Sequence, residues 1–275
     1  MTEPSKVSNA FDVTGKHVLI TGGARGIGYM MAEGLLRAGA VVFISTRKPD
    51  AAKDAEHSLS EHGEVHAVAA DVATEDGRRA LIDAVAAKTD HLDALINNAG
   101  ATWGATFDDF PDSAWDKVLG LNVKAPFALA QLARPLLEAA AREGSPARII
   151  NVGSVDGLAV PNFENYSYAA SKAAVHHLTR QLAANLAPSI LVNAIAPGPF
   201  PTKMMKWALD ERGDEIAAAN PLRRIGRPED IAAMVIFLVA PASSYVTGAV
   251  IPLDGGLTTT MSVALSEPTA SSQEV

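Results

Sequence analysis

Short runs rich in β-branched residues alternate with longer amphipathic segments from Lys16 onward, and this alternation restricts the fold more than any other feature. It is typical of βαβ units, in which a crossover helix returns the chain to a parallel sheet. Seven strands predict an α/β fold, a Rossmann-type, doubly wound parallel sheet between two helix layers. The expected strands span residues 17–21, 41–45, 65–69, 94–97, 148–152, 190–195 and 249–253.

Right-handed crossovers place the carboxyl ends of all these strands at one edge of the sheet, which is where open α/β sheets bind their ligands. The chain has 275 residues, 48% of them hydrophobic, so one core can hold it together. We expect a single domain at residues 13–257. A flexible arm is expected at 1–12 and a loosely ordered tail at 258–275, where the composition turns polar.

Composition excludes several classes of partner. The net charge of -8 disfavours nucleic acid and anionic membrane, which both attract clustered Lys and Arg. No segment provides the ~20 apolar residues of a membrane span. The absence of cysteine excludes disulfides and thiolate chemistry, and it fits a reducing compartment, so we expect a cytoplasmic protein. No metal site is expected, because His176 and His177 diverge on a helix, and the histidines are predicted at the surface.

A glycine-rich turn follows the first strand and precedes a segment, 29–37, that is compatible with a helix. Glycines let a backbone approach a pyrophosphate, whose charge then meets free amides at the positive end of the helix. The sequence predicts a dinucleotide site there, and the alternative is a plain tight turn. The run is Thr21-Gly22-Gly23-Ala24-Arg25-Gly26-Ile27-Gly28.

The end of the second strand bears on the choice of dinucleotide. A carboxylate there would bind a free ribose 2′-hydroxyl, but this chain has Ser45-Thr46-Arg47-Lys48. Arg47 and Arg25 suit a 2′-phosphate, so NADP(H) is predicted over NAD(H), the alternative being two solvated arginines.

Tyr168 and Lys172 lie four residues apart in a segment compatible with a helix to about Leu186. Four residues bring side chains onto one face, whereas Tyr166 lies six residues from Lys172 and diverges. A free tyrosine titrates near 10, which is high for proton transfer at neutral pH. A neighbouring ammonium is expected to lower that pKa, and desolvation would oppose the shift. A chance pair is the alternative.

The order of the motifs indicates a known family. The glycine turn, the run 97–100, Asn122, Gly153-Ser154, the run 168–172 and Pro197-Gly198 occur in that sequence. Together they resemble the short-chain dehydrogenase/reductase family over roughly residues 13–256. The resemblance implies an NADP(H)-dependent carbonyl reductase in which Tyr168 donates a proton and Ser154 holds the carbonyl oxygen. It implies that Lys172 lowers the tyrosine pKa and binds the nicotinamide ribose, and that Asn122 holds a relay water.

The cofactor residues combine those read from the turn and strand ends with those implied by the resemblance. They are Gly22, Arg25, Gly26, Ile27, Gly28, Thr46, Arg47, Lys48, Asp71, Val72, Asn98, Ala99, Gly100, Tyr168, Lys172, Ile195, Pro197, Gly198 and Thr202.

Substrate choice is assigned to the segments 101–112, 155–165 and 199–224, which follow strand ends. Their bulky side chains would line an apolar acyl pocket or serve helix packing or a subunit interface. Their basic side chains would receive a coenzyme A phosphate or an acidic carrier protein, or form a solvated face. The bulky residues are Trp103, Phe163, Phe200, Met204, Met205 and Trp207, and the basic ones are Lys203, Lys206, Arg223 and Arg224.

Within the family the chain is similar to bacterial 3-oxoacyl-[acyl-carrier-protein] reductases, including the rhamnolipid-precursor type, in Trp103-Gly104 and the run 227–230. That similarity implies a 3-oxoacyl thioester substrate. Rivals are a polyol, sugar-acid or xenobiotic carbonyl reductase and, in another class, a noncatalytic NADP(H)-binding regulator. Family members are commonly tetramers or dimers, so a homotetramer or homodimer is expected, packed through long helices at 113–141 and 168–186.

Overall fold

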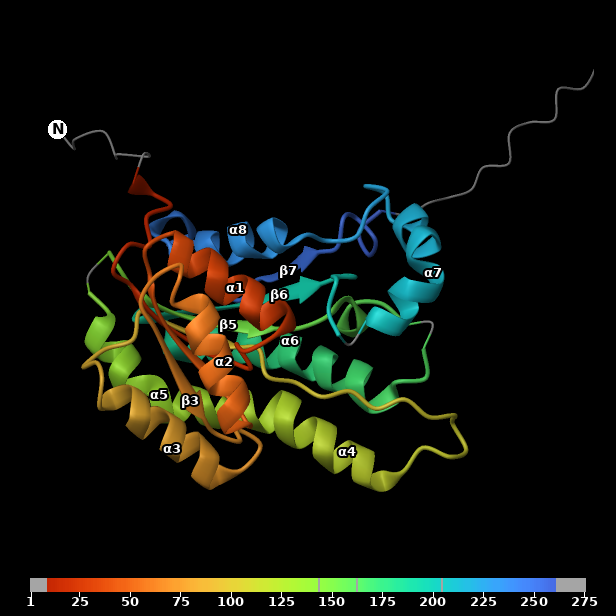
Figure 1. Cartoon of the computed structure of the whole chain (residues 1–275), viewed down its shortest axis with the longest axis horizontal. Helices are drawn as coiled ribbons and strands as arrows, with labels where there is room; N and C mark the ends of the chain where they lie inside the picture. The colour runs from red at the N-terminus through yellow and green to blue at the C-terminus, as the bar shows by residue number, and fades with distance from the viewer. Residues whose placement is uncertain (1–8, 143, 162, 204, 261–275) are drawn as a thin grey trace, which may run out of the picture.

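A computed structural model describes residues 9–142, 144–161, 163–203 and 205–260, except for the side chains at 206–208. Seven parallel strands form one sheet in the order β3-β2-β1-β4-β5-β6-β7 (Figure 1). All seven expected strands are confirmed, with ends that differ by at most two residues. They are β1 His17–Thr21, β2 Val41–Thr46, β3 Val65–Ala69, β4 Ala94–Asn97, β5 Ala147–Val152, β6 Ile190–Pro197 and β7 Val250–Leu253.

Helices cover both faces of the sheet, which confirms the doubly wound architecture (Figure 1). Side chains along β1 alternate between two cores: Val18 and Ile20 join one, and Leu19 joins the other. The first core contains α1 Gly26–Arg37, α2 Pro49–Leu59 and α8 Pro228–Val239, and the second contains α3 Glu75–Ala86, α5 Ala125–Ala140 and α6 Tyr166–Leu186. A strand apolar on both faces can only be stable between two such layers.

The prediction of one long helix at 113–141 is wrong in one respect, because this segment is not a continuous helix. It divides into α4 Asp112–Leu119, a π-helical turn Gly120–Lys124 and α5. Pro126 at the start of α5 has no amide to donate to the carbonyl of Asn122, so the α-helical hydrogen-bond ladder is interrupted there. Single π turns of this kind are frequent at functional sites, and this one carries Asn122.

The remaining helix, α7 Lys206–Ala219, lies beyond the carboxyl end of β6 (Figure 1). The expected arm at 1–12 and tail at 258–275 lie mostly outside the described residues. Within them, Ala10 accepts a hydrogen bond from Ala242 and Phe11 lies 6.3 Å from the ring of Phe237. The domain boundaries stay predictions.

Candidate active site

The glycine turn between β1 and α1 has a backbone that side chains would obstruct. Gly22 and Gly26 have φ values of 68° and 57°, in the left-handed region that favours glycine. A Cβ on Gly28 would stand 2.4 Å from the carbonyl oxygen of Gly22. The Nδ2 of Asn98 donates to the carbonyls of Thr21 and Gly22, at 2.8 and 3.1 Å. The turn is therefore rigid, with a bare surface at the start of α1.

Thr21 is a residue of this region that the sequence analysis missed. Its hydroxyl accepts hydrogen bonds from the amides of Asn98 and Ala99, both at 3.0 Å, so it fixes the end of β4 against the glycine turn. The available signal in the sequence was a threonine hydroxyl directly before the first glycine. Gly100 follows in the same segment, and a Cβ there would lie 3.3 Å from Oδ1 of Asn122.

The segment after β6 lies beside the glycine turn. Pro197 ends the strand, and Gly198 donates to the carbonyl of Leu253 at 3.0 Å. The Cγ2 of Thr202 stands 3.6 Å from the Cβ position of Gly26. Ile195 is fully buried, with its carbonyl accepting the amide of Gly153 at 2.7 Å. Ile27 packs partly buried against the core.

Positive charge gathers at the end of β2. Thr46 is half-buried, and Arg47 and Lys48 are exposed, as is Arg25 at the start of α1. None of these three cations forms an ion pair with another described residue. They are thus free to meet an anion.

Arg78 supports the segment after β3 and was not singled out from the sequence. It is 4% exposed, and its guanidinium donates to the carbonyls of Val72 and Ala73 at 2.9 and 3.0 Å. Asp71 accepts the amide of Ala73 at 3.1 Å. An arginine three and four residues before buried Leu81 and Ile82, on the apolar face of α3, was the available signal.

Asn122 is buried in the π turn and uses both ends of its amide. Its Oδ1 accepts the amide of Ala101 at 2.8 Å, and its Nδ2 donates to the carbonyl of Ala101 and to Ser171 Oγ, both at 2.9 Å. Ser171 in turn donates to the carbonyl of Tyr168 at 2.7 Å. Asn122 is thus one contact removed from the backbone of Tyr168.

Ser154, Tyr168 and Lys172 converge between β5 and α6. Ser154 follows β5 and is 8% exposed, and its hydroxyl is close enough to the Tyr168 phenol to lower the phenol's pKa. Lys172 is 5% exposed, with Nζ 5.4 Å from the Tyr168 ring centroid. That Nζ donates to the carbonyl of Val152 at 2.7 Å, which holds the lysine against the end of β5.

The pKa of Tyr168 departs from the sequence expectation. Burial raises it to about 12; Ser154 acts to lower it and the charge of Asp156 to raise it. Burial also lowers the pKa of Lys172 to about 8, with Asp156 opposing the change. The expected lowering of the tyrosine pKa is therefore wrong in this geometry: burial has the largest effect on Tyr168, and Lys172 is not among the groups that shift its pKa.

His176 also corrects the sequence analysis, which placed the histidines at the surface. It is 3% exposed, one turn beyond Lys172, and neither ring nitrogen has a hydrogen-bond partner among the described residues. A Cβ on Gly153 would stand 2.1 Å from its Nε2, and one on Gly157 would stand 2.8 Å from its Cε1. Burial lowers the pKa of His176. The ring therefore packs, neutral, beneath the turn that carries Ser154.

Two of the residues assigned to an acyl pocket are engaged elsewhere. Phe200 is 2% exposed in the core, and Lys117 Nζ sits 5.0 Å from the Trp103 ring centroid. Phe163 is 57% exposed. Met205 and Lys203 are described, whereas Met204 and the side chains of Lys206 and Trp207 lie outside the described residues.

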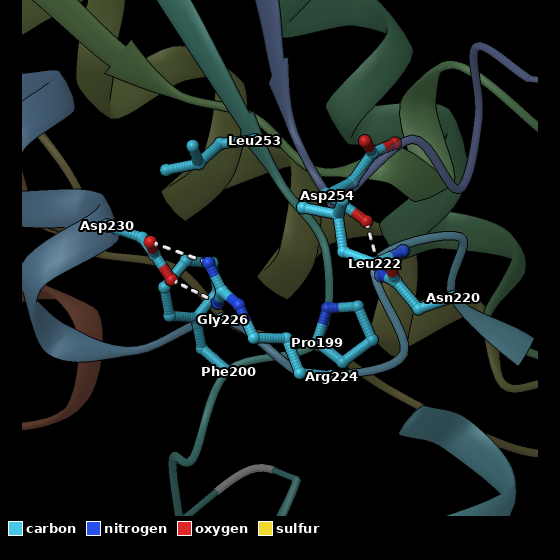
Figure 2. Close-up of a pocket in the computed structure, with 10 residues that line it drawn as sticks. Pro199, Phe200, Asn220, Leu222, Arg224, Gly226, Asp230, Leu253 and Asp254 are labelled. Atoms are coloured by element: carbon cyan, nitrogen blue, oxygen red, sulfur yellow. Dashed lines mark hydrogen bonds and ion pairs between the residues drawn. The ribbon is translucent and has the colours of Figure 1, made fainter. Parts of the chain in front are cut away.

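Among the basic residues assigned to a phosphate arm, Arg224 is already paired. It binds Asp230 through two hydrogen bonds of 2.6 and 3.0 Å. Arg223 donates to the carbonyl of Ala218. The Arg224–Asp230 pair and Phe200 line a cavity, as Figure 2 shows. The volume of this cavity is about 140 Å³. The described lining of this cavity contains none of Asn122, Ser154, Tyr168 and Lys172.

The part of the chain that the structure describes lacks two further features. No cluster of three His, Asp or Glu side chains there is arranged to hold a metal ion. No helix in those ranges is both long and apolar enough to cross a membrane.

Known proteins resemble the chain along nearly its whole length. A family model described as "Enoyl-(Acyl carrier protein) reductase" matches residues 22–258. The "Rhamnolipids biosynthesis 3-oxoacyl-[acyl-carrier-protein] reductase" of Pseudomonas aeruginosa is 46% identical, covering 90% of this chain and 97% of its own. The "2-dehydro-3-deoxy-D-gluconate 5-dehydrogenase" of Escherichia coli is 35% identical, covering 91% and 98%.

Solved structures agree with those relatives. The "Pseudomonas aeruginosa RhlG/NADP active-site complex" superposes with a TM-score of 0.88 at 44% identity, covering 91% of this chain and 99% of that one. A "short-chain type dehydrogenase/reductase from Mycobacterium marinum" gives 0.84 at 32% identity, covering 93% and 100%. With the family model matching most of its residues, this chain belongs to the short-chain dehydrogenase/reductase family.

Proposed function

We propose that this chain is an NADP(H)-dependent oxidoreductase that reduces a ketone to a secondary alcohol. The observation that carries the proposal is the convergence of Ser154, Tyr168 and Lys172 at the carboxyl edge of the sheet, next to the glycine turn. A carbonyl oxygen placed between the two hydroxyls would meet both a hydrogen-bond donor and a proton donor.

The protonation states suit reduction at neutral pH. A pKa of about 12 keeps the Tyr168 phenol protonated, so it can donate its proton to the carbonyl oxygen that Ser154 holds. A pKa of about 8 leaves Lys172 mostly charged, so its ammonium can stabilise the tyrosinate that remains. Asn122 holds the segment after β4 against Ser171, and we assign it the role of holding a water that relays protons.

The residues of the glycine turn fit a dinucleotide. Gly28 leaves bare backbone that a Cβ would fill, and the first turn of α1 presents amides without a capping side chain. Arg25 and Arg47 lack described ion-pair partners, and no carboxylate ends β2, so NADP(H) is favoured over NAD(H). NADPH supplies a hydride to the carbonyl carbon when it is bound. The NADP complex of the Pseudomonas aeruginosa protein supports this assignment.

We infer that the substrate is a 3-oxoacyl thioester, of acyl carrier protein or coenzyme A, which becomes the 3-hydroxyacyl form. The 46% identical Pseudomonas aeruginosa relative is named for that activity. A sugar-acid reductase is the rival, since the Escherichia coli gluconate 5-dehydrogenase is 35% identical. The intact Tyr168 and Lys172 count against a noncatalytic NADP(H)-binding regulator.

A substrate panel tests the proposal. The wild type and Tyr168→Phe would be mixed with NADPH and an acetoacetyl thioester, a diketone or a keto sugar acid, and the absorbance of NADPH followed. We expect the wild type to oxidise NADPH in the presence of the thioester, and we expect Tyr168→Phe to abolish this oxidation. Faster turnover of the keto sugar acid than of the thioester would contradict the proposed thioester substrate and favour a sugar-acid reductase. Binding of NADPH without turnover of any carbonyl would favour the regulator.

We further propose a cytoplasmic location and a homotetramer or homodimer, with residues 13–257 as the catalytic domain. The lack of cysteine fits a reducing compartment. Sedimentation of the purified chain would decide the oligomeric state.

A further inference from the structure

A side-chain hydrogen bond joins the turn that carries Ser154 to the residue directly before the helix that carries Tyr168. The Nδ2 of Asn165 donates to Oδ2 of Asp156 at 2.9 Å. Asp156 lies in the short 3₁₀ turn Val155–Gly157, two residues after Ser154, and Asn165 directly precedes α6. The contact therefore spans the two segments whose hydroxyls must meet at one carbonyl oxygen.

Apart from Gly157, which lies against His176, the loop between these residues adds little packing. Leu158, Val160 and Phe163 are 41%, 94% and 57% exposed, so apolar packing does not anchor this loop. Ser154 accepts the amide of Asp156 at 3.2 Å, which links its hydroxyl to the same turn. A shift of Asp156 would therefore move Ser154 relative to α6.

Asn165 forgoes a favourable local role to make this contact. Asparagine is a preferred residue at a helix start, where its oxygen accepts an amide of the first turn and stabilises the helix by about 1 kcal/mol. Asn165 occupies that position but makes no capping hydrogen bond, and its buried Oδ1 has no partner among the described residues. Its amide is directed at Asp156 instead.

The charge of Asp156 acts on the proton-transfer residues. The charged or titratable groups that face it are Lys172 and Tyr168 on α6, and His176 packs against the neighbouring Gly157. Its carboxylate raises the pKa of both Tyr168 and Lys172. Burial raises the pKa of Asp156 itself, with Asn165 and Lys172 opposing the change.

We propose that Asp156 and Asn165 are positioning residues: their hydrogen bond sets the approach of Ser154 to Tyr168. The carboxylate of Asp156, fixed in the same turn, then also has an electrostatic role, because its negative charge disfavours the tyrosinate. This inference rests on the proposed reductase function. It adds two residues, from the segment 155–165 previously assigned only to substrate choice, that act without touching the reacting atoms.

Three substitutions separate the two roles. Asp156→Asn removes the charge but keeps an oxygen that can accept from Asn165. Asn165→Ala removes the hydrogen bond but keeps the charge, and Asp156→Ala removes both. Misplacement of a reacting group costs up to about 100-fold in rate, so we expect kcat to fall roughly 10- to 100-fold in Asn165→Ala and Asp156→Ala. In Asp156→Asn we expect kcat to stay within about threefold of the wild type, since a neutral oxygen still accepts the bond.

The pH profile should divide the same variants differently. Without the negative charge, the pKa values of Tyr168 and Lys172 fall, so the basic limb of kcat/KM for reduction moves to lower pH in Asp156→Asn and Asp156→Ala. It should stay in place in Asn165→Ala. The exposed Asp83→Asn on α3 and Ser58→Ala, which removes the hydrogen bond to Tyr29, are controls for loss of charge and of a surface hydrogen bond.

A readout without turnover keeps this inference distinct from the proposed function. The ultraviolet difference spectrum of tyrosine ionisation, with Tyr168→Phe subtracted, reports Tyr168 alone. We expect Tyr168 to ionise at lower pH in Asp156→Asn than in the wild type or Asp83→Asn. Unchanged ionisation would overturn the electrostatic role, and full kcat in Asn165→Ala would overturn the positioning role. If Asp156→Ala does not fold, the other two variants still decide both points.

Discussion

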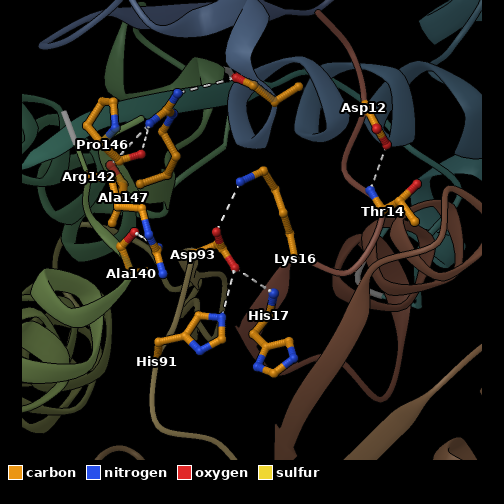
Figure 3. A network of polar contacts seen from close by, with 12 residues as sticks. Asp12, Thr14, Lys16, His17, His91, Asp93, Ala140, Arg142, Pro146 and Ala147 are labelled. Atoms are coloured by element: carbon orange, nitrogen blue, oxygen red, sulfur yellow. Dashed lines mark hydrogen bonds and ion pairs between the residues drawn. The ribbon is translucent and has the colours of Figure 1, made fainter. Parts of the chain in front are cut away.

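The two edges of the sheet differ in whether their buried polar groups have hydrogen-bond partners. At the amino edge, Asp93 accepts the backbone amide of His17 at 2.9 Å and pairs with Lys16 at 3.0 Å (Figure 3). The ring of His17 stacks on His91 with centroids 4.5 Å apart and meets the hydroxyl of Thr89. Each of these polar side chains has a partner.

The carboxyl edge, by contrast, holds buried polar atoms without partners. They lie at the end of β4, beneath the segment after β3, directly before α6 and within α6. Among the described residues they are Arg78 Nε, Asn97 Oδ1, Asn165 Oδ1, Ser167 Oγ and both ring nitrogens of His176. The large pKa shifts of Tyr168 and Lys172 occur at the same edge.

A buried polar atom without a partner costs about 1 to 3 kcal/mol, and these atoms at the carboxyl edge are ones that the described protein residues do not satisfy. Perturbed pKa values alone do not distinguish the two edges, because burial also lowers the pKa of Arg148, near the start of β5, to about 10. The difference in hydrogen-bond partners indicates that the amino edge stabilises the fold and the carboxyl edge performs the chemistry. Substitutions at the two edges should therefore separate activity from stability.

Tyr168→Phe should give the largest effect and the sharpest separation. Removal of a general acid lowers kcat by roughly 100- to 10,000-fold, whereas a buried Phe fills the same space, so the melting temperature should stay within a few degrees. Steady-state kinetics with NADPH and thermal melting check the two halves. A variant that lost activity only because it unfolded would break the comparison.

Arg47→Ala should have the next largest effect, on the choice of cofactor. Loss of one charged hydrogen bond to a 2′-phosphate is worth about 1.5 to 3 kcal/mol, so the preference for NADPH over NADH in kcat/KM should narrow by roughly 10- to 100-fold. Lys53→Ala, an exposed cation on α2, serves as the control. Equal kcat/KM with NADPH and NADH in the wild type would show that the carboxyl edge does not bind the 2′-phosphate.

The sequence predicted most of the fold because parallel strands that are buried on both faces consist of continuous apolar runs, as in Val41-Val42-Phe43-Ile44. It predicted candidate site residues because strand ends and helix spacing place them, as with Tyr168 and Lys172. It did not predict the π turn at Asn122. That turn forms because Pro126 has no amide hydrogen to donate to the carbonyl of Asn122, one helical turn earlier.

Burial was the other property that sequence reasoning could not supply. His176 is polar and was expected at the surface, yet Gly153 and Gly157 leave space that its ring fills. The same desolvation reverses the expected direction of the Tyr168 pKa shift. Both depend on which segments pack together, which no local pattern of residues records.

Asp93→Ala tests the amino edge. It removes an acceptor for the amide of His17 and the partner of Lys16, so we expect a loss of about 2 kcal/mol in the free energy of unfolding. The kcat should stay close to that of the wild type, because Asp93 lies at the opposite edge from Tyr168. Chemical denaturation and steady-state kinetics on the same preparation measure both. A large fall in kcat with unchanged stability would contradict the division between the edges.

His17→Gln should produce the smallest effect, and it sharpens the comparison because each edge holds one histidine with a lowered pKa. Burial and the neighbouring His91 lower the pKa of His17, and burial lowers that of His176. The folded state then binds fewer protons than the unfolded chain, so stability is full above the unfolded pKa of 6.5 and is lost as the pH falls below it. His17→Gln cannot gain that charge, and the loss of melting temperature on acidification should become smaller in it. His57→Gln, an exposed histidine on α2, should leave the loss unchanged. If His176→Gln reduces the loss of melting temperature that remains in His17→Gln, that remaining loss belongs to the carboxyl edge. If neither variant reduces the loss, neither histidine governs stability in acid.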